Sequence, residues 1–116
     1  MATELRPVLS IRLFREEKCF GSGIAQLLRL VEEHHSLRAA AQAMDMAYSK
    51  AWTIVGRCEE ELGFALLIRA TGGKHGGGAA LTPEAKTLLE TYDRYCRRLR
   101  EQAELLFREE FGAEPG

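Results

Sequence analysis

Five side chains that can hydrogen bond to nucleic acid fall between residues 48 and 57: Tyr48, Ser49, Lys50, Thr53 and Arg57. Lysine and arginine can donate to guanine, serine and threonine can bond several base edges, and tyrosine can hold a phosphate. The group could therefore read duplex DNA if one helix presented it outward. The alternative interpretation is an ordinary solvated face of a helical bundle.

The apolar spacing around this group predicts two short helices joined by a corner. The first repeats at i, i+3, i+4 and i+7 through Leu37, Ala40, Ala41 and Met44. The second continues with a new phase through Ala51, Val55, Cys58 and Leu62. Ser36 can cap the first helix, and Asp45 tolerates the left-handed backbone of a tight corner. This pattern predicts a helix-turn-helix whose second helix carries the polar group, with Arg38 of the first helix as a further DNA contact.

Composition limits the other classes of function. The chain has 116 residues, enough for one domain, and a formal net charge of -1, so a DNA surface must arise from local clustering. The odd number of cysteines and their wide separation predict neither disulfides nor a zinc site, and we expect no metal and no cofactor. MATELRP at the start lacks a signal-peptide core and no apolar run reaches about 18 residues. We expect a soluble, cytoplasmic protein without a membrane partner.

The residues before the helix-turn-helix predict a β-hairpin and one helix. Residues 7–14 alternate between apolar and polar side chains, as a half-buried strand does. A charged turn over 15–18 and a short return strand at 19–20 follow, and Gly21-Ser22-Gly23 joins this hairpin to a helix over 24–35.

A second hairpin is predicted directly after the helix-turn-helix. Residues 65–71 and 79–82 are its strands, and GGKHGGG is its tip. Such a hairpin is the wing of a winged helix, and Arg69, Lys74 and His75 are candidates for contacts with the DNA backbone or minor groove. A phosphate loop of the Walker type would need serine or threonine after the lysine, but His75 follows Lys74 here, so that interpretation is poor. A flexible surface loop is the remaining alternative.

The last part of the chain predicts one long helix. Thr82-Pro83-Glu84 is a helix-start signal, and the helix should run to about residue 111. A coiled-coil rhythm along it predicts a homodimer interface made by Leu88, Tyr92, Tyr95, Leu99 and Leu106. The predicted fold is therefore mostly α with small β: a winged helix-turn-helix with its N-terminal hairpin over 1–82, and a dimerisation helix with a tail over 83–116.

Two motifs carry a resemblance to a known family. AYSKAW at 47–52 and RATGGKHGGGAALT at 69–82 resemble the N-terminal winged-helix DNA-binding domain of ModE-type molybdate-responsive transcriptional regulators. The resemblance extends over nearly the whole chain, and the glycine-rich wing is its most specific part. It implies a dimer that binds a palindromic operator near genes of molybdate uptake or molybdoenzymes.

Three departures from the family pattern stand out. Ala47 lies where the family usually has a capping serine, and Ser49 lies where a basic residue often follows the tyrosine. The family's C-terminal oxyanion-binding domains have no counterpart after the last helix, so we expect a stand-alone form. No molybdate site can be assigned by resemblance, and a separate oxyanion-sensing protein is a conceivable partner.

Two other classes of function compete with a DNA-binding regulator. An enzyme is disfavoured because the sequence offers no set of nucleophile, base and orienting group, and no phosphate fingerprint. A protein-interaction or dimerisation module of winged-helix fold, with little or no DNA binding, remains the alternative.

Overall fold

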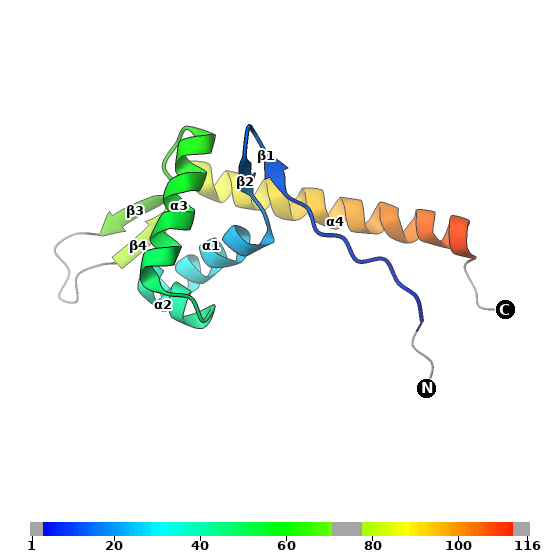
Figure 1. Ribbon diagram of the computed structural model, residues 1–116, viewed down its shortest axis with the longest axis horizontal. Helices are drawn as coiled ribbons and strands as arrows, with labels where there is room; N and C mark the ends of the chain where they lie inside the picture. The colour runs from blue at the N-terminus through cyan, green and yellow to red at the C-terminus, as the bar shows by residue number, and fades with distance from the viewer. Residues whose placement is uncertain (1–3, 71–77, 113–116) are drawn as a thin grey trace.

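The computed structural model describes residues 4–70 and 78–112 of the chain. Its helices are α1 (Ser22–His34), α2 (Leu37–Ala43), α3 (Tyr48–Leu62) and α4 (Pro83–Phe111), and its strands are β1 (Leu13–Phe14), β2 (Lys18–Phe20), β3 (Leu67–Ala70) and β4 (Gly78–Leu81). The strands form two separate antiparallel hairpins, β1–β2 and β3–β4. This arrangement confirms the mostly helical, winged helix-turn-helix fold with a long last helix (Figure 1).

The core lies where α1 meets α2 and α3. Leu27, Leu28 and Val31 of α1 are completely buried, because they recur on one face of that helix. Ala40 of α2 and Ala51 of α3 are also completely buried, and their small side chains let the helix backbones approach closely. The alanine-rich first helix of the predicted helix-turn-helix therefore serves packing.

The corner between α2 and α3 has the predicted chemistry. The Ser36 hydroxyl accepts a hydrogen bond from the Ala39 N–H at 3.0 Å and so caps α2. Asp45 has a φ of 57°, in the left-handed region, and the Met46 N–H returns to the Ala41 carbonyl at 2.9 Å. The Ser36 cap fixes the start of α2, and the Met46 bond closes its end, so that α3 begins at Tyr48.

The N-terminal strand is much shorter than the sequence predicts. Only Leu13 and Phe14 pair with β2, whereas residues 7–12 run in an extended conformation beside α4 (Figure 1). The predicted strand over 7–14 was wrong in length because β2 offers only three residues before α1 begins at Ser22. Residues 7–12 find another partner instead: the Tyr92 hydroxyl donates to the Ile11 carbonyl at 2.7 Å.

The second hairpin is the predicted wing, and hydrogen bonds from Leu66, just before β3, and from Ala79 of β4 hold it to the helices. β3 and β4 pair in register from Leu67–Leu81 to Ala70–Gly78. The Glu59 carboxylate of α3 accepts from the Leu66 N–H at 2.7 Å, and the Ala79 N–H donates to the His35 carbonyl at 3.0 Å. The wing is therefore held against both the recognition helix and the end of α1.

The start of α4 is anchored in the same region. The Thr82 hydroxyl accepts from the Ala85 N–H at 3.0 Å and donates to the Ala65 carbonyl at 2.7 Å. Four residues spaced 4-3-4 along the first half of α4 are buried against the winged unit: Ala85, Leu89, Tyr92 and Cys96. The second half projects away, which gives a molecule of 63 × 34 × 21 Å (Figure 1).

The predicted interface on α4 therefore needs one correction. Tyr92 is only 5% exposed, and its ring packs edge-on against Phe20 at 5.0 Å between centroids. It belongs to the core of its own chain because β2 and the extended N-terminal segment cover it. Tyr95 and Leu106, by contrast, are 49% and 55% exposed. Helical geometry places these two and Leu99 about 70° around the helix from the buried stripe.

Candidate nucleic-acid interface

Helix α3 divides into a buried face and an open one. Ala51, Val55 and Cys58 are buried against the core. Ser49, Thr53 and Arg57 point the opposite way at helical spacing and are exposed, and Lys50 is exposed beside them. The structure thus presents four of the five predicted polar side chains to solvent, while Tyr48 is half-buried, on a helix of the width that a major groove admits.

The N-terminus of α3 is chemically open. Ala47 is the N-cap residue and makes no side-chain cap, and the first turn contains no acidic residue. The free N–H groups and the positive end of the helix dipole therefore attract anions at this end. At the other end of the open face, Glu60 is exposed. Its charge repels phosphate, which leaves the N-terminal two-thirds of α3 as the part suited to DNA.

Thr53 has a restricted hydrogen-bonding role. Its hydroxyl donates back to the Ser49 carbonyl at 3.1 Å, within the same helix. The proton is thereby used, and the oxygen lone pairs and the methyl group remain for a ligand. Among bases, adenine and cytosine amino groups and the thymine methyl suit these groups.

Gly56 leaves a position without a side chain on the open face of α3. A Cβ built at this position would meet nothing within 4 Å, so no internal contact requires a glycine. Glycine within a helix costs roughly 0.5–1 kcal/mol relative to alanine. The missing side chain leaves room for close approach next to Thr53 and Arg57.

The structure adds one residue to those that the sequence pattern indicates. Trp52 lies under the guanidinium of Arg69 of β3, 3.7 Å from ring centroid to Cζ. The Tyr48 ring packs edge-on against Trp52, with 6.1 Å between the ring centroids. The guanidinium of Arg38 of α2 lies over the Tyr48 ring, with its Cζ 4.1 Å from the centroid. Three predicted DNA contacts are therefore brought together by Trp52. The signal available in the sequence was the aromatic pair at i and i+4.

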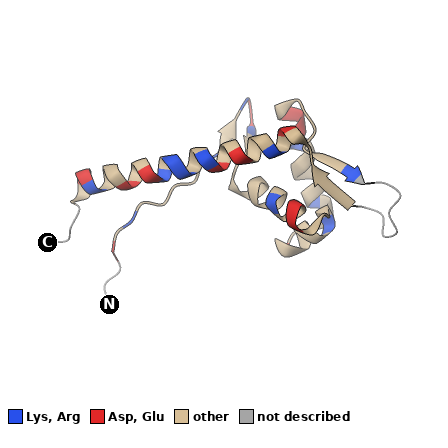
Figure 2. Cartoon of the chain, turned by 180° about the vertical axis from the view of Figure 1, so that it is seen from behind, with Lys and Arg blue, Asp and Glu red and all other residues tan. Residues whose placement is uncertain are grey.

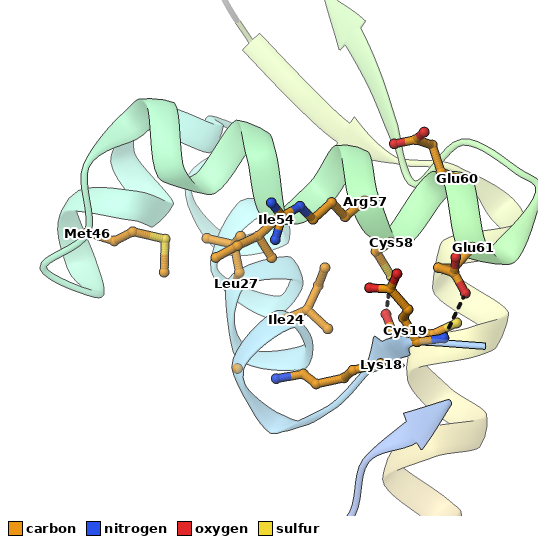
Figure 3. A pocket seen from close by; sticks show the side chains of 12 residues that line it. Lys18, Cys19, Ile24, Leu27, Met46, Ile54, Arg57, Cys58, Glu60 and Glu61 are labelled. Carbon is orange, nitrogen blue, oxygen red and sulfur yellow. Dashed lines mark hydrogen bonds between the residues drawn. The ribbon is translucent and has the colours of Figure 1, made fainter. Parts of the chain in front are cut away.

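A cavity of about 670 Å³ opens beside the recognition helix, between α1, α3 and β2 (Figure 3). Ile24, Leu27 and Ile54 form its apolar wall, and Arg57 lies at its rim. The Cys58 thiol in this cavity donates to the Cys19 carbonyl, and burial raises the pKa of Cys58 to about 12. This thiol is protonated at neutral pH and is a packing group. All three cysteines, Cys19, Cys58 and Cys96, are buried and unpaired in the structure.

Lys74 and His75, at the predicted tip of the wing, lie outside the described residues. In the described part, both signs of charge occur on the helix-turn-helix and along α4, and Arg69 is the basic residue of the wing (Figure 2). Across residues 4–70 and 78–112, no group of three or more histidine, cysteine or acidic side chains could hold a metal ion. The helices of this same part include none long and apolar enough to cross a membrane.

Comparison with known proteins agrees with this geometry. A model of the family described as "Bacterial regulatory helix-turn-helix protein, lysR family" matches residues 25–86, from α1 through the wing to the start of α4. This match covers more than half of the chain. The chain belongs to this family. The lysR-family match spans the helix-turn-helix and wing described above, and it makes α3 the recognition helix of a regulatory protein.

Several curated proteins are similar to this lysR-family chain. The transcriptional regulator ModE of Haemophilus influenzae is 38% identical over 68 residues, which cover 59% of this chain and 27% of that protein. The molybdenum-pterin-binding protein MopB of Rhodobacter capsulatus is 35% identical over 72 residues, 62% of this chain and 27% of that protein. The DNA-binding transcriptional dual regulator ModE of Escherichia coli is 34% identical over 67 residues, which cover 58% of this chain and 26% of that protein.

These matches confirm the resemblance to ModE-type regulators. The chain spans less than a third of the length of these relatives.

Proposed function

We propose that the chain is a sequence-specific, double-stranded-DNA-binding transcriptional regulator that acts as a homodimer on a palindromic operator. The observation that carries this proposal is the open face of α3: Ser49, Lys50, Thr53 and Arg57 are exposed together next to an open helix N-terminus. Side chains of these types, on a helix flanked by a wing, suit base edges in the major groove.

Dimerisation is proposed through the second half of α4. Leu105 and Leu106 there are 50% and 55% exposed and Phe111 is 70% exposed, and Tyr95, just before this half, is 49% exposed. Apolar side chains repeated along one projecting helix call for a partner helix, and a second copy of the chain is the simplest one. Two copies related by a twofold axis would present two recognition helices to a palindrome.

We propose that this regulator controls genes of molybdate transport or of molybdoenzymes. The support is the function of the similar proteins, which include a molybdenum-pterin-binding protein and a molybdenum transport protein. Control by an effector would come from another protein that senses an oxyanion or from a further domain of a longer chain.

The proposal is tested by titrating the chain with a duplex that it enriches from a random pool, and with a scrambled duplex, at about 50 and 200 mM salt. Phosphate contacts release counterions, so affinity should fall by roughly a thousandfold or more over this range if six or more phosphates are bound. Affinity that is independent of salt and of sequence would contradict DNA binding and favour a protein-interaction module.

Two matched variants refine the same titration. Lys50→Ala removes a charge from the open face of α3 and should relax base preference at specific positions, at a cost of roughly 1–3 kcal/mol. Arg97→Ala removes a charge from the exposed side of α4 and should bind as the wild type does. If both variants lowered affinity equally for all sequences, α3 would not read bases.

A further inference from the structure

Arg38, Tyr48, Trp52 and Arg69 form one continuous row across three elements. The row runs from Arg38 on α2, over the two rings of α3, to Arg69 on β3. The Arg38 Cζ lies 4.1 Å from the centroid of the Tyr48 ring, and the Arg69 Cζ lies 3.7 Å from that of Trp52. The two ring centroids are 6.1 Å apart. The two aromatic rings are half-buried and pack against the hydrophobic core. The two arginines at the ends of the row are exposed. Two half-buried aromatic rings thus lie beneath two arginine guanidinium groups that face solvent.

The chemistry of stacked arginine makes these cations ready to bind an anion. A guanidinium that lies flat on a ring is held in plane, and its N–H donors remain at the edge. Within the part of the chain that the structure describes, no carboxylate lies within 4 Å of either guanidinium. Phosphate oxygens match the forked donors of arginine in two parallel hydrogen bonds.

The position of the row fits the phosphates that border a groove. Tyr48 and Trp52 are four residues apart and occupy the flank of α3 between its buried face and the line of Ser49 and Thr53. When a helix of about 10–12 Å diameter lies in a major groove about 12 Å wide, its flanks face the phosphate walls. The open face meets bases and the row meets backbone.

We propose that Tyr48 and Trp52 are positioning residues of a preformed phosphate clamp, which hold Arg38 and Arg69 in place before DNA arrives and join the wing to the recognition helix. The clamp rests on the proposed DNA binding. It assigns no base recognition to Trp52: the ring acts through Arg69. The gain is in preorganisation, because an arginine that is already ordered loses less conformational freedom on binding.

The first test uses the free protein. Trp52 is the only tryptophan of the chain, so the indole fluorescence comes from this ring and reports on its surroundings, which include Arg69. Arg69→Ala should expose the ring to water and shift its emission to longer wavelength, whereas Arg97→Ala should leave the emission unchanged. An emission that Arg69→Ala does not alter would overturn the row in solution.

The second test is a double-mutant cycle on DNA with Trp52→Leu, Arg69→Ala and the combined variant. Trp52→Leu keeps an apolar cover and removes the ring, and we expect it to weaken selected and scrambled duplexes alike, by roughly three- to thirtyfold. Arg69→Ala should also flatten the plot of log affinity against log salt by about one unit for each phosphate that it no longer neutralises. The combined variant should bind no worse than Arg69→Ala, because Trp52 acts through the arginine. Trp52→Phe should restore most of the affinity.

The outcomes separate the clamp from the proposed function. Wild-type protein that shows no salt-dependent DNA binding would overturn both. Wild-type binding with independent, additive losses for Trp52→Leu and Arg69→Ala, or a change in base preference for Trp52→Leu, would overturn the clamp alone. If Trp52→Leu does not fold, Trp52→Phe and the fluorescence of Arg69→Ala decide.

Discussion

At the scale of single residues, Tyr92 shows how one side chain joins the projecting helix to the rest of the chain. Its ring contacts Phe20 of β2, and its hydroxyl donates to the Ile11 carbonyl at 2.7 Å. The net value of such a buried hydrogen bond is about 1 kcal/mol. Burial, followed by a hydrogen bond with the Cys96 side chain, raises the pKa of Tyr92 from 10.0 to about 12.

This pKa predicts how Tyr92→Phe changes stability with pH. A raised folded-state pKa contributes stability that is fully present below pH 10 and lost as the pH rises towards about 12. The variant should therefore be less stable than the wild type near neutral pH by about 1 kcal/mol. Above pH 10 the wild type should lose about 1.4 kcal/mol per pH unit relative to the variant, so the difference closes within about one pH unit and reverses before pH 12.

Urea unfolding at several pH values checks this, with Tyr95→Phe as the control. Tyr95 is 49% exposed, and its hydroxyl should contribute little at any pH. A difference between Tyr92→Phe and wild type that stayed constant up to pH 12 would contradict the role of burial.

At the scale of elements, the ends of helices were predictable and the contacts between elements were not. Ser36, Asp45, Gly63 and Thr82 each lie at the helix end or corner that their chemistry indicates. These signals are local, because a cap or a left-handed corner involves residues only a few positions apart.

Three features depended on residues far apart in the sequence. Residues 7–12 have the alternation of a strand but pair with no strand, since β2 is too short to reach them. Tyr92 fits the coiled-coil rhythm but is covered by the N-terminal part of its own chain. Trp52 lies against the guanidinium of Arg69, a residue 17 positions further along the chain. Periodicity gives the face of a helix and leaves open what covers it.

At this scale, the proposed dimer contact along the second half of α4 can be tested by mutation. Leu106 is 55% exposed, and Leu106→Asp would place a charge within the proposed helix pair. We expect monomers in light scattering, because two aspartates facing each other across a twofold axis repel and remove apolar packing from the helix pair. Arg97→Asp, about 180° around the helix from Leu106, should leave the dimer intact. A Leu106→Asp protein that remained dimeric would move the interface elsewhere.

At the scale of the whole molecule, the distribution of charge matters more than its sum. The net charge is -1, so the chain has no general attraction to polyanions. Acidic and basic residues are interleaved along α4, as Figure 2 shows, whereas Arg38, Lys50, Arg57 and Arg69 are exposed on the winged unit and the acidic residues of α3 lie at its C-terminal end. An elongated molecule of 63 Å can thus place the proposed dimer contact at one end and these four exposed basic side chains at the other.

The most direct measurement is selection by the wild-type chain from a pool of random duplexes, followed by sequencing of the bound fraction. A symmetric dimer that reads DNA through α3 predicts an inverted repeat whose half-sites are centred about 34 Å, or roughly 10 base pairs, apart. Positions beneath the wing and the phosphate clamp should show little base preference. Enrichment of an unrepeated sequence, or no enrichment at all, would contradict the proposal that two recognition helices act together.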